Sequence, residues 1–316
     1  MSRQIVGTVR RVTAFALTVV ALAATLAAFQ VPAPASALSG SQFDPSNIIS
    51  DQNFYDSNAM SQAQIQAFLD GKEPSCGNSN CLRLVRTTST SRAADQMCAA
   101  YAGAGSETTA AIIFKVQQAC GISAKVLLVT LEKEQGLITA TAPSASKLDR
   151  AMGYACPDNT ATPGWCDPTY GGLYNQLYRA AWQFKRYGNP PGTSNFFTWF
   201  PVGSPAPVQY NPAASCGAPV ITIKNKATAA LYYYTPYQPN PAALANLYGT
   251  GDSCSAYGNR NFWVFYNQWF GPTTVPAGTP NGVLDPLTTT FGQINLSGWA
   301  FDPDATSASV NIAVQV

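Results

Sequence analysis

The stretch LLVTLEKEQGLITATA, residues 127 to 142, is an apolar run that ends in two of the four glutamates of this 316-residue chain. Its spacing predicts a helix that Ser123 caps and that Gly136 ends. A preceding helix is predicted to begin at Ser106 and to stop at Gly121, with one apolar face. The two helices form a predicted hairpin, the usual skeleton of a compact α-domain.

Glu132 and Glu134 cannot act together, because side chains two residues apart on a helix point roughly 200° away from each other. The negative end of the helix dipole and an apolar wall both favour a neutral carboxyl group in the last turn. Apolar residues lie at helical contact spacings on both sides of Glu134, namely Leu127, Leu131, Leu137 and Ile138. Glu132 has apolar residues at such spacings on one side only. Glycosidic bond cleavage needs such a neutral acid, so Glu134 is the predicted proton donor and Glu132 a surface residue. In the alternative, one or both glutamates are solvated helix-end residues beside Lys133.

The chain contains no histidine. This absence excludes Ser-His-Asp hydrolysis, Cys-His proteolysis and the usual histidine-bearing zinc hydrolase sites. If the chain is an enzyme that works near neutral pH, a carboxyl group is therefore the expected proton donor. No cofactor and no metal site is predicted.

The first 37 residues predict export. Arg3, Arg10 and Arg11 precede an uncharged apolar stretch that is followed by APASA, a secretory signal with a cleavage site after Ala37. An uncleaved anchor is the alternative. Cleavage would leave 18 − 3 = 15 basic against 16 acidic residues, a net charge of about −1, which argues against a nucleic-acid partner. We expect a secreted, wall-associated protein without stable membrane insertion, and no particular oligomeric state follows.

Eight cysteines follow the signal, an even number that suggests disulfides in an oxidising compartment. Pairing of neighbours in sequence order is preferred, because each pair would hold one local feature. A zinc site is the weaker alternative, since no CxxC spacing occurs. The expected pairs are Cys76 with Cys81, Cys98 with Cys120, Cys156 with Cys166 and Cys216 with Cys254.

A helix, then Glu134 at its end, then a glycine-containing turn resembles the catalytic helix of the lysozyme-like superfamily, especially lytic transglycosylases and bacterial glucosaminidases. Gln135 stands where transglycosylases usually carry serine. The segment RAMGYACPD, residues 150 to 158, resembles the Gly153-centred loop of these families. The segment ATAALYYYTPYQPN resembles their later helix with an active-site tyrosine, which nominates Tyr233 or Tyr234.

Residues 43 to 270 as a whole also resemble secreted, cysteine-containing lysozyme-like proteins of high-GC Gram-positive bacteria, some of which are labelled haemagglutinin-related. The expected fold is mainly α, a lysozyme-like helical domain with disulfide-stapled loops, followed by a linker and an incomplete small β module. The expected parts are a signal at 1–37, a docking helix with a stapled loop at 38–104, the catalytic domain at 105–270, the linker at 271–286 and β-strands at 287–316.

A second carboxylate would distinguish inverting hydrolysis from a transglycosylase, which can use one acid and an intramolecular attack. Of the three candidates Asp149, Asp158 and Asp167, the preferred one is Asp158, in the loop held by the third disulfide. Turn capping is its alternative role. Aromatic rings stack on sugar faces, so the loop residues expected to face the glycan are Tyr154, Trp165 and Tyr170.

The predicted function is cleavage of the β-1,4 bonds between N-acetylmuramic acid and N-acetylglucosamine in peptidoglycan, by hydrolysis or transglycosylation with Glu134 as general acid. The predicted partners are peptidoglycan glycan strands. The alternative is a non-catalytic cell-wall-binding, carbohydrate-binding or adhesive surface protein that keeps the scaffold. Gln135 and the appended β-segment favour that alternative.

Overall fold

The computed structural model describes residues 38–157, 162 and 164–274, together with the backbone of four short strands between 281 and 301. The predicted signal, Asp158 and the last expected strand lie outside the described residues. None of the helices in the described part of the chain is both long enough and apolar enough to cross a bilayer.

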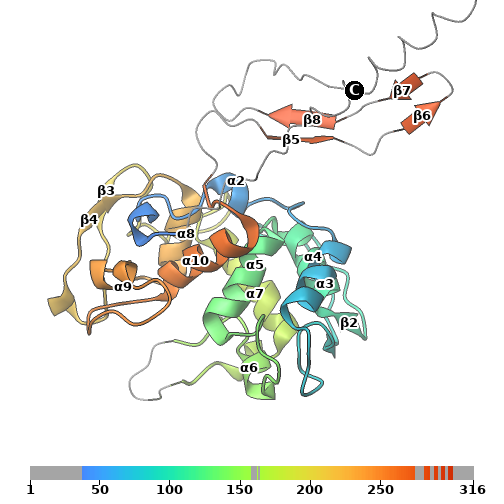
Figure 1. Ribbon diagram of the computed structural model, residues 1–316, viewed down its shortest axis with the longest axis horizontal. Coiled ribbons are helices and arrows are strands. Elements are labelled where there is room, and N and C mark those ends of the chain that lie inside the picture. Colours follow the sequence, from blue (N-terminus) through green and yellow to red (C-terminus); the bar gives the residue numbers. More distant parts are fainter. Residues whose placement is uncertain are drawn as a thin grey trace, which may run out of the picture. The chain divides into compact units, whose positions relative to one another are not determined.

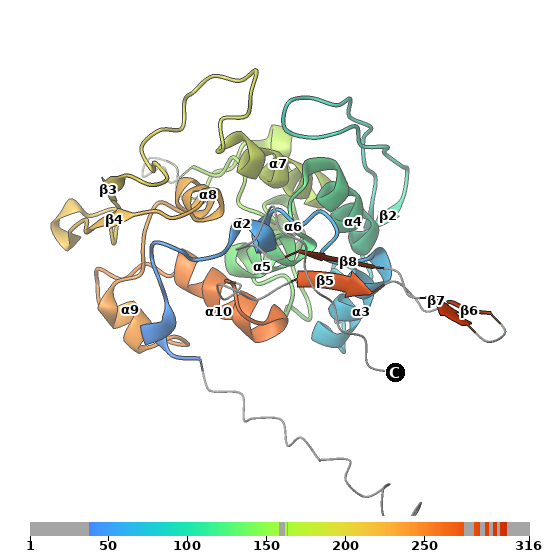
Figure 2. The ribbon, with the colours of Figure 1, turned by 90° about the horizontal axis from the view of Figure 1, so that it is seen from above.

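The described chain is mainly helical, as expected (Figures 1 and 2). Short 3₁₀ turns lie at Gly40–Gln42, Pro168–Tyr170 and Ala214–Cys216. The α-helices are α2 (Asp51–Phe54), α3 (Gln62–Lys72), α4 (Thr109–Cys120), α5 (Ala124–Gln135), α6 (Ala145–Asp149), α7 (Leu173–Arg186), α8 (Lys226–Tyr234), α9 (Pro241–Ala245) and α10 (Gly258–Phe270).

Helix α5 lies in the middle of this assembly, with α4, α7, α8 and α10 around it (Figure 2). Every residue of α5 from Val126 to Leu131 is buried. Helix α3 packs on α4, and its Ile65 and Leu69 enter the same hydrophobic core as α5. The region predicted as a separate docking helix and stapled loop therefore shares one core with the helices that follow it.

Glycine ends α4 and α5 as predicted. Gly121 and Gly136 adopt the left-handed conformation, with φ of 63° and 61°, which side chains other than glycine disfavour. The predicted start of α4 is wrong: Thr108 is the N-cap, and Ser106 lies outside the helix. Ser106 Oγ instead accepts a hydrogen bond from Arg86 Nε at 2.9 Å.

The capping hydrogen bond predicted from Ser123 at the start of α5 is also wrong. Ser123 is the N-cap residue, but its side chain makes no capping bond. Gln117 takes over this role from α4, because its Oε1 accepts the Ala124 N–H at 2.9 Å and its Nε2 donates to the Met60 carbonyl at 2.9 Å. A buried side chain from another helix thus satisfies the donor that a local cap would otherwise satisfy.

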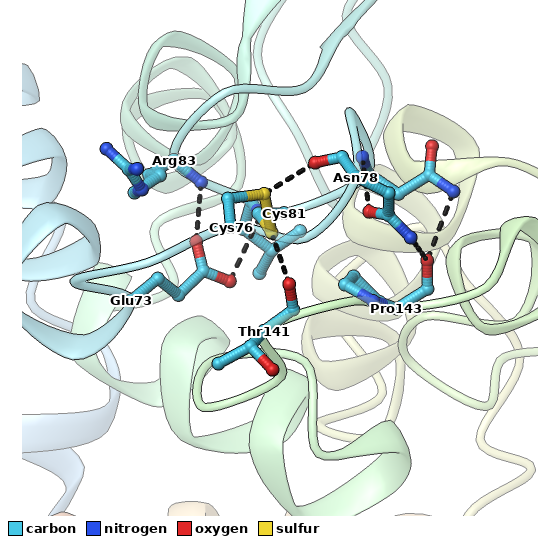
Figure 3. The surroundings of a disulfide bond; sticks show 9 residues. Glu73, Cys76, Asn78, Cys81, Arg83, Thr141 and Pro143 are labelled. Carbon is cyan, nitrogen blue, oxygen red and sulfur yellow. Dashed lines mark hydrogen bonds between the residues drawn. A yellow bond between two sulfur atoms is a disulfide. The ribbon is translucent and has the colours of Figure 1, made fainter.

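The structure confirms the four predicted disulfides in sequence order. The loop closed by Cys76 and Cys81 supports the segment that follows α5 (Figure 3). Asn78 and Asn80 both donate to the Pro143 carbonyl, at 3.0 and 3.1 Å. The buried Glu73 fixes the same loop by accepting the backbone N–H groups of Leu82 and Arg83, at 3.1 and 2.8 Å.

The strands are short and antiparallel. Strand β1 (Arg86–Thr87) pairs with β2 (Glu107–Thr108), and β3 (Pro205–Pro207) pairs with β4 (Val220–Thr222). Towards the end of the chain, β5 (Asn281–Leu284) pairs with β8 (Gly298–Phe301), and β6 (Thr288–Thr290) pairs with β7 (Gln293–Asn295). Strand β5 begins inside the stretch whose composition predicts a linker.

A buried carboxylate network beside β2 predicts a pH-dependent stability. Glu107 accepts hydrogen bonds from Tyr101 at 2.8 Å, from Lys115 at 2.5 Å and from Ser89. Burial acts to raise the pKa of Glu107, but the bonds from Lys115, Ser89 and Tyr101 hold it below its ordinary value. A lowered folded-state pKa stabilises the protein above the unfolded value, and that stabilisation is lost as the pH falls through the folded value.

We therefore expect Glu107→Gln to lower the free energy of unfolding near neutral pH by about 1 to 3 kcal/mol. The difference from the wild type should shrink as the pH falls below about 4. Urea unfolding followed by circular dichroism across pH 3 to 7 measures it. Asp70→Asn, at an exposed position of α3, is the control with little expected effect. A Glu107 difference that stays constant with pH would contradict this assignment.

Candidate functional site

Glu134 lies in the last turn of α5, and its side chain is 24% exposed. The four apolar neighbours predicted from helical spacing, Leu127, Leu131, Leu137 and Ile138, have no exposed surface. The carboxyl group is thus at the edge of the core and still reachable from solvent. Two of its expected apolar neighbours, Leu137 and Ile138, lie beyond the end of α5 at Gln135.

A charged group lies next to Glu134, where the sequence predicts apolar neighbours. Lys133 Nζ lies 2.7 Å from Glu134 Oε1, and the lysine side chain is only 2% exposed. The same ammonium donates to Thr235 Oγ1 at 2.6 Å and lies 5.3 Å from the centre of the Tyr234 ring. Lys133 is therefore not a solvated helix-end residue, because contacts from a segment about a hundred residues later cover its long stem and its charged end.

Glu132 is partly exposed, as predicted for a surface residue, and it also has a structural role. Its side chain is half-buried, and Oε2 accepts the backbone N–H groups of Ile138 and Thr139 at 2.8 and 3.1 Å. Oε1 accepts the Thr139 hydroxyl at 2.7 Å. The two glutamates therefore have separate partners, as helix geometry requires, and Glu132 anchors the turn that follows α5.

The structure places the Gly153 loop against Glu134. Gly153 has φ of 71°, and a Cβ atom at this position would lie 2.8 Å from Glu134 Oε2. Real Cβ atoms essentially never come so close to another heavy atom. The loop can approach the carboxylate this closely only because residue 153 has no side chain.

Gln176 on α7 holds that loop in place. Its Oε1 accepts the N–H groups of Met152 and Tyr154, both at 3.1 Å. Its Nε2 donates to the carbonyls of Tyr154 at 3.0 Å and Tyr170 at 2.9 Å. Sequence reasoning missed this residue. The available signal was a glutamine three residues after Leu173, inside the apolar stripe of the helix.

We expect Gln176→Leu to lower the free energy of unfolding by about 2 to 4 kcal/mol, because three backbone groups of the loop and the Tyr170 carbonyl would lose their partner inside the protein. Thermal and urea unfolding measure the change. Gln62→Leu, at an exposed position of α3, is the matched control and should change stability by less than about 0.5 kcal/mol. Equal effects of the two substitutions would contradict the role given to Gln176.

Of the two nominated tyrosines, Tyr234 belongs to this site. Its hydroxyl donates to the Met152 carbonyl, next to Gly153. Burial and the nearby Glu134 charge raise the pKa of Tyr234 well above its ordinary value, so the hydroxyl stays neutral and remains a donor. Tyr233 faces a different neighbourhood, where its oxygen accepts the Phe200 N–H at 2.9 Å.

The other predicted residues are placed as follows. Tyr154 and Tyr170 pack edge to face with ring centres 5.2 Å apart, and Trp165 is 48% exposed. Asp167 caps a 3₁₀ turn by accepting the Thr169 N–H at 2.9 Å, which is a structural role. The preferred second carboxylate, Asp158, lies outside the described residues and stays a prediction.

Within the described residues, no group of three His, Cys, Asp or Glu side chains is arranged to hold a metal ion. What the structure does bring together is a reachable carboxylate, an enclosed ammonium, a neutral phenol and a backbone loop. These groups are Glu134, Lys133, Tyr234 and the Gly153 loop. The partly exposed Glu134 carboxylate is the group of this cluster that a molecule from solvent can reach.

A family model described as the N-terminal domain of LasA matches residues 47–187, which is under half of the chain. The matched part contains α5, the Gly153 loop and α7, and it ends before α8, so Tyr234 and Thr235 lie outside it. No curated protein and no solved structure matches the chain.

The matched model carries a different name from the lysozyme-like superfamily, so that resemblance stays a prediction. The four disulfides fit a protein exported to an oxidising compartment.

Proposed function

We propose that this protein is a secreted glycosidase that cleaves the β-1,4 bonds of peptidoglycan with Glu134 as the general acid. The observation that carries the proposal is the position of Glu134, at the reachable edge of the core between the Lys133 ammonium and the Gly153 backbone. The match to a domain of LasA supports the cell wall as the place of action. The identity of the cleaved bond rests on the chemistry of the site.

In the proposed reaction, the protonated Glu134 carboxyl group donates its proton to the glycosidic oxygen as the bond from that oxygen to the sugar C1 breaks. The carboxylate left behind lies beside Lys133, whose ammonium stabilises the new negative charge. Water, or a hydroxyl or acetamido group of the muramic acid itself, then bonds to C1, and the proton that this group loses returns to the Glu134 carboxylate. The first route gives hydrolysis and the other gives an intramolecular transfer.

Tyr234 and the Gly153 loop would position the sugar next to the acid. The loop is fixed from two sides, by Gln176 and by the Tyr234 hydroxyl. A site of this kind gains rate by holding the reacting atoms in place, because small displacements of the acid are costly for proton transfer. Positioning by the loop and proton donation by Glu134 are therefore separate contributions.

Cell-wall zymograms test the proposal. Purified mature protein should clear peptidoglycan embedded in a gel, and its Glu134→Gln variant should not. The alternative is a non-catalytic wall-binding or adhesive protein, and the sequence feature that favours it is Gln135 after the glutamate. Retention on insoluble peptidoglycan, without clearing by the wild type on several wall types, would support that alternative and overturn the glycosidase.

A further inference from the structure

The loop between α7 and β3 displays aromatic side chains to solvent. Phe196 is 62% exposed and Trp199 is 48% exposed, and their rings pack edge to face with centres 5.6 Å apart. Phe197 and Tyr233 lie under them, with Trp199 5.0 Å from Tyr233. We call Phe196, Phe197, Trp199 and Tyr233 the aromatic platform. Contiguous exposed apolar surface of this kind marks interaction sites.

The platform is held by its own loop. Asn189 Oδ1 accepts the Phe197 N–H at 3.1 Å, and Asn189 Nδ2 donates to the Phe197 carbonyl at 2.6 Å. The Arg186 guanidinium lies 5.1 Å from the Phe197 ring centre and donates to the Ser194 carbonyl at 2.9 Å. Rings fixed before binding lose less conformational freedom when a ligand stacks on them.

A pocket of about 280 Å³ adjoins the platform, and its lining includes Tyr187, Asn189, Phe200 and Lys226. Lys226 is exposed, and neither it nor Lys185 is among the cations that form ion pairs in the described part of the chain. Burial, and then the charge of Lys226, lower the pKa of Lys185, so the two ammonium groups lie close enough to repel each other. Positive charge without a carboxylate partner thus lies beside apolar rings.

The platform and the Glu134 site share one aromatic wall. Tyr187 stacks on Tyr233 with ring centres 5.4 Å apart and packs edge to face with Tyr234 at 6.5 Å. Burial, and then the charge of Glu134, raise the pKa of Tyr234.

We propose that the aromatic platform and Lys226 bind a muramyl peptide unit of the glycan strand. The sugar face stacks on Phe196 and Trp199, and a carboxylate of the stem peptide pairs with Lys226. Charge complementarity favours a peptide-bearing sugar, because its carboxylate can pair with the Lys226 ammonium and a neutral sugar has no such group. The inference rests on the proposed function and adds to it a subsite that recognises the peptide-bearing sugar.

Isothermal titration calorimetry on the full mature chain tests this subsite. All proteins carry Glu134→Gln so that binding is measured without turnover. One probe is the disaccharide of N-acetylglucosamine and N-acetylmuramic acid with its stem peptide, and the other is neutral N,N′-diacetylchitobiose. Trp199→Ala should weaken both probes about tenfold. Lys226→Gln should weaken only the peptide-bearing probe, by about five- to tenfold.

Tyr248→Ala is the matched control, because Tyr248 is 69% exposed and is not part of the platform. Unchanged affinity in both Trp199→Ala and Lys226→Gln would overturn the subsite, and so would an equal loss in Tyr248→Ala. Failure of the proposed function would show separately, as the absence of cleavage by the wild type. It would leave the affinity comparison readable.

Discussion

Replacing Glu134 by glutamine is expected to slow the release of soluble muropeptides from peptidoglycan by about a hundredfold to ten-thousandfold. Glutamine has nearly the same shape but carries no acidic proton, so the leaving sugar oxygen would depart without protonation. The variant should remain folded, because the side chain lies at the partly exposed edge of the core. Release assays with purified peptidoglycan measure the rate, and circular dichroism checks the fold.

Glu132→Gln is the matched control for that experiment. It removes the other carboxylate of the same helix, two residues away, and weakens the anchor of the Ile138 and Thr139 backbone. We expect a loss of stability of about 1 to 2 kcal/mol without a comparable loss of rate at a temperature where the protein stays folded. If both variants lose activity equally, Glu134 is not distinguished as the acid.

The second large effect is expected at Gly153. Gly153→Ala imposes a left-handed conformation on alanine and places a Cβ atom 2.8 Å from Glu134 Oε2. Either the carboxylate or the loop must move. We expect this displacement of the acid relative to the loop to reduce the rate of cleavage by about a hundredfold. The stability should also fall, by about 1 to 2 kcal/mol.

Gly136→Ala separates the cost of the left-handed backbone conformation from the effect of contact with Glu134. Gly136 has almost the same backbone conformation, with φ of 61°, but a Cβ atom there would meet nothing within 4 Å. It should therefore show the conformational cost with little loss of rate. Steady-state release rates and unfolding curves of the two variants give the comparison. Equal rates in both would mean that contact with Glu134 does not matter for the reaction.

Local signals in the sequence were enough to predict much of the fold. The glycines that end α4 and α5 follow from spacing within a few residues. The disulfides pair neighbours in sequence, so they too required only local reasoning. Helix geometry also separated Glu132 from Glu134 correctly.

The surroundings of Glu134 could not be predicted in the same way, because its partners come from distant parts of the chain. Lys133 is enclosed by Tyr234 on α8 and by Thr235 just after it. The turn after α5 is held by the loop between Cys76 and Cys81, and the Gly153 loop by Gln176. Tertiary contacts of this kind have no periodic signature in sequence.

Mass spectrometry of the products from purified peptidoglycan tests the central claim most directly. Wild-type protein and Glu134→Gln are incubated with the same preparation, and the soluble fragments are identified. The glycosidase predicts fragments with cleaved glycan and intact stem peptides, released by the wild type only, with reducing or anhydro-muramic ends according to the route. Fragments cut within the peptides while the glycan stays intact, or the same fragments from both proteins, would contradict it.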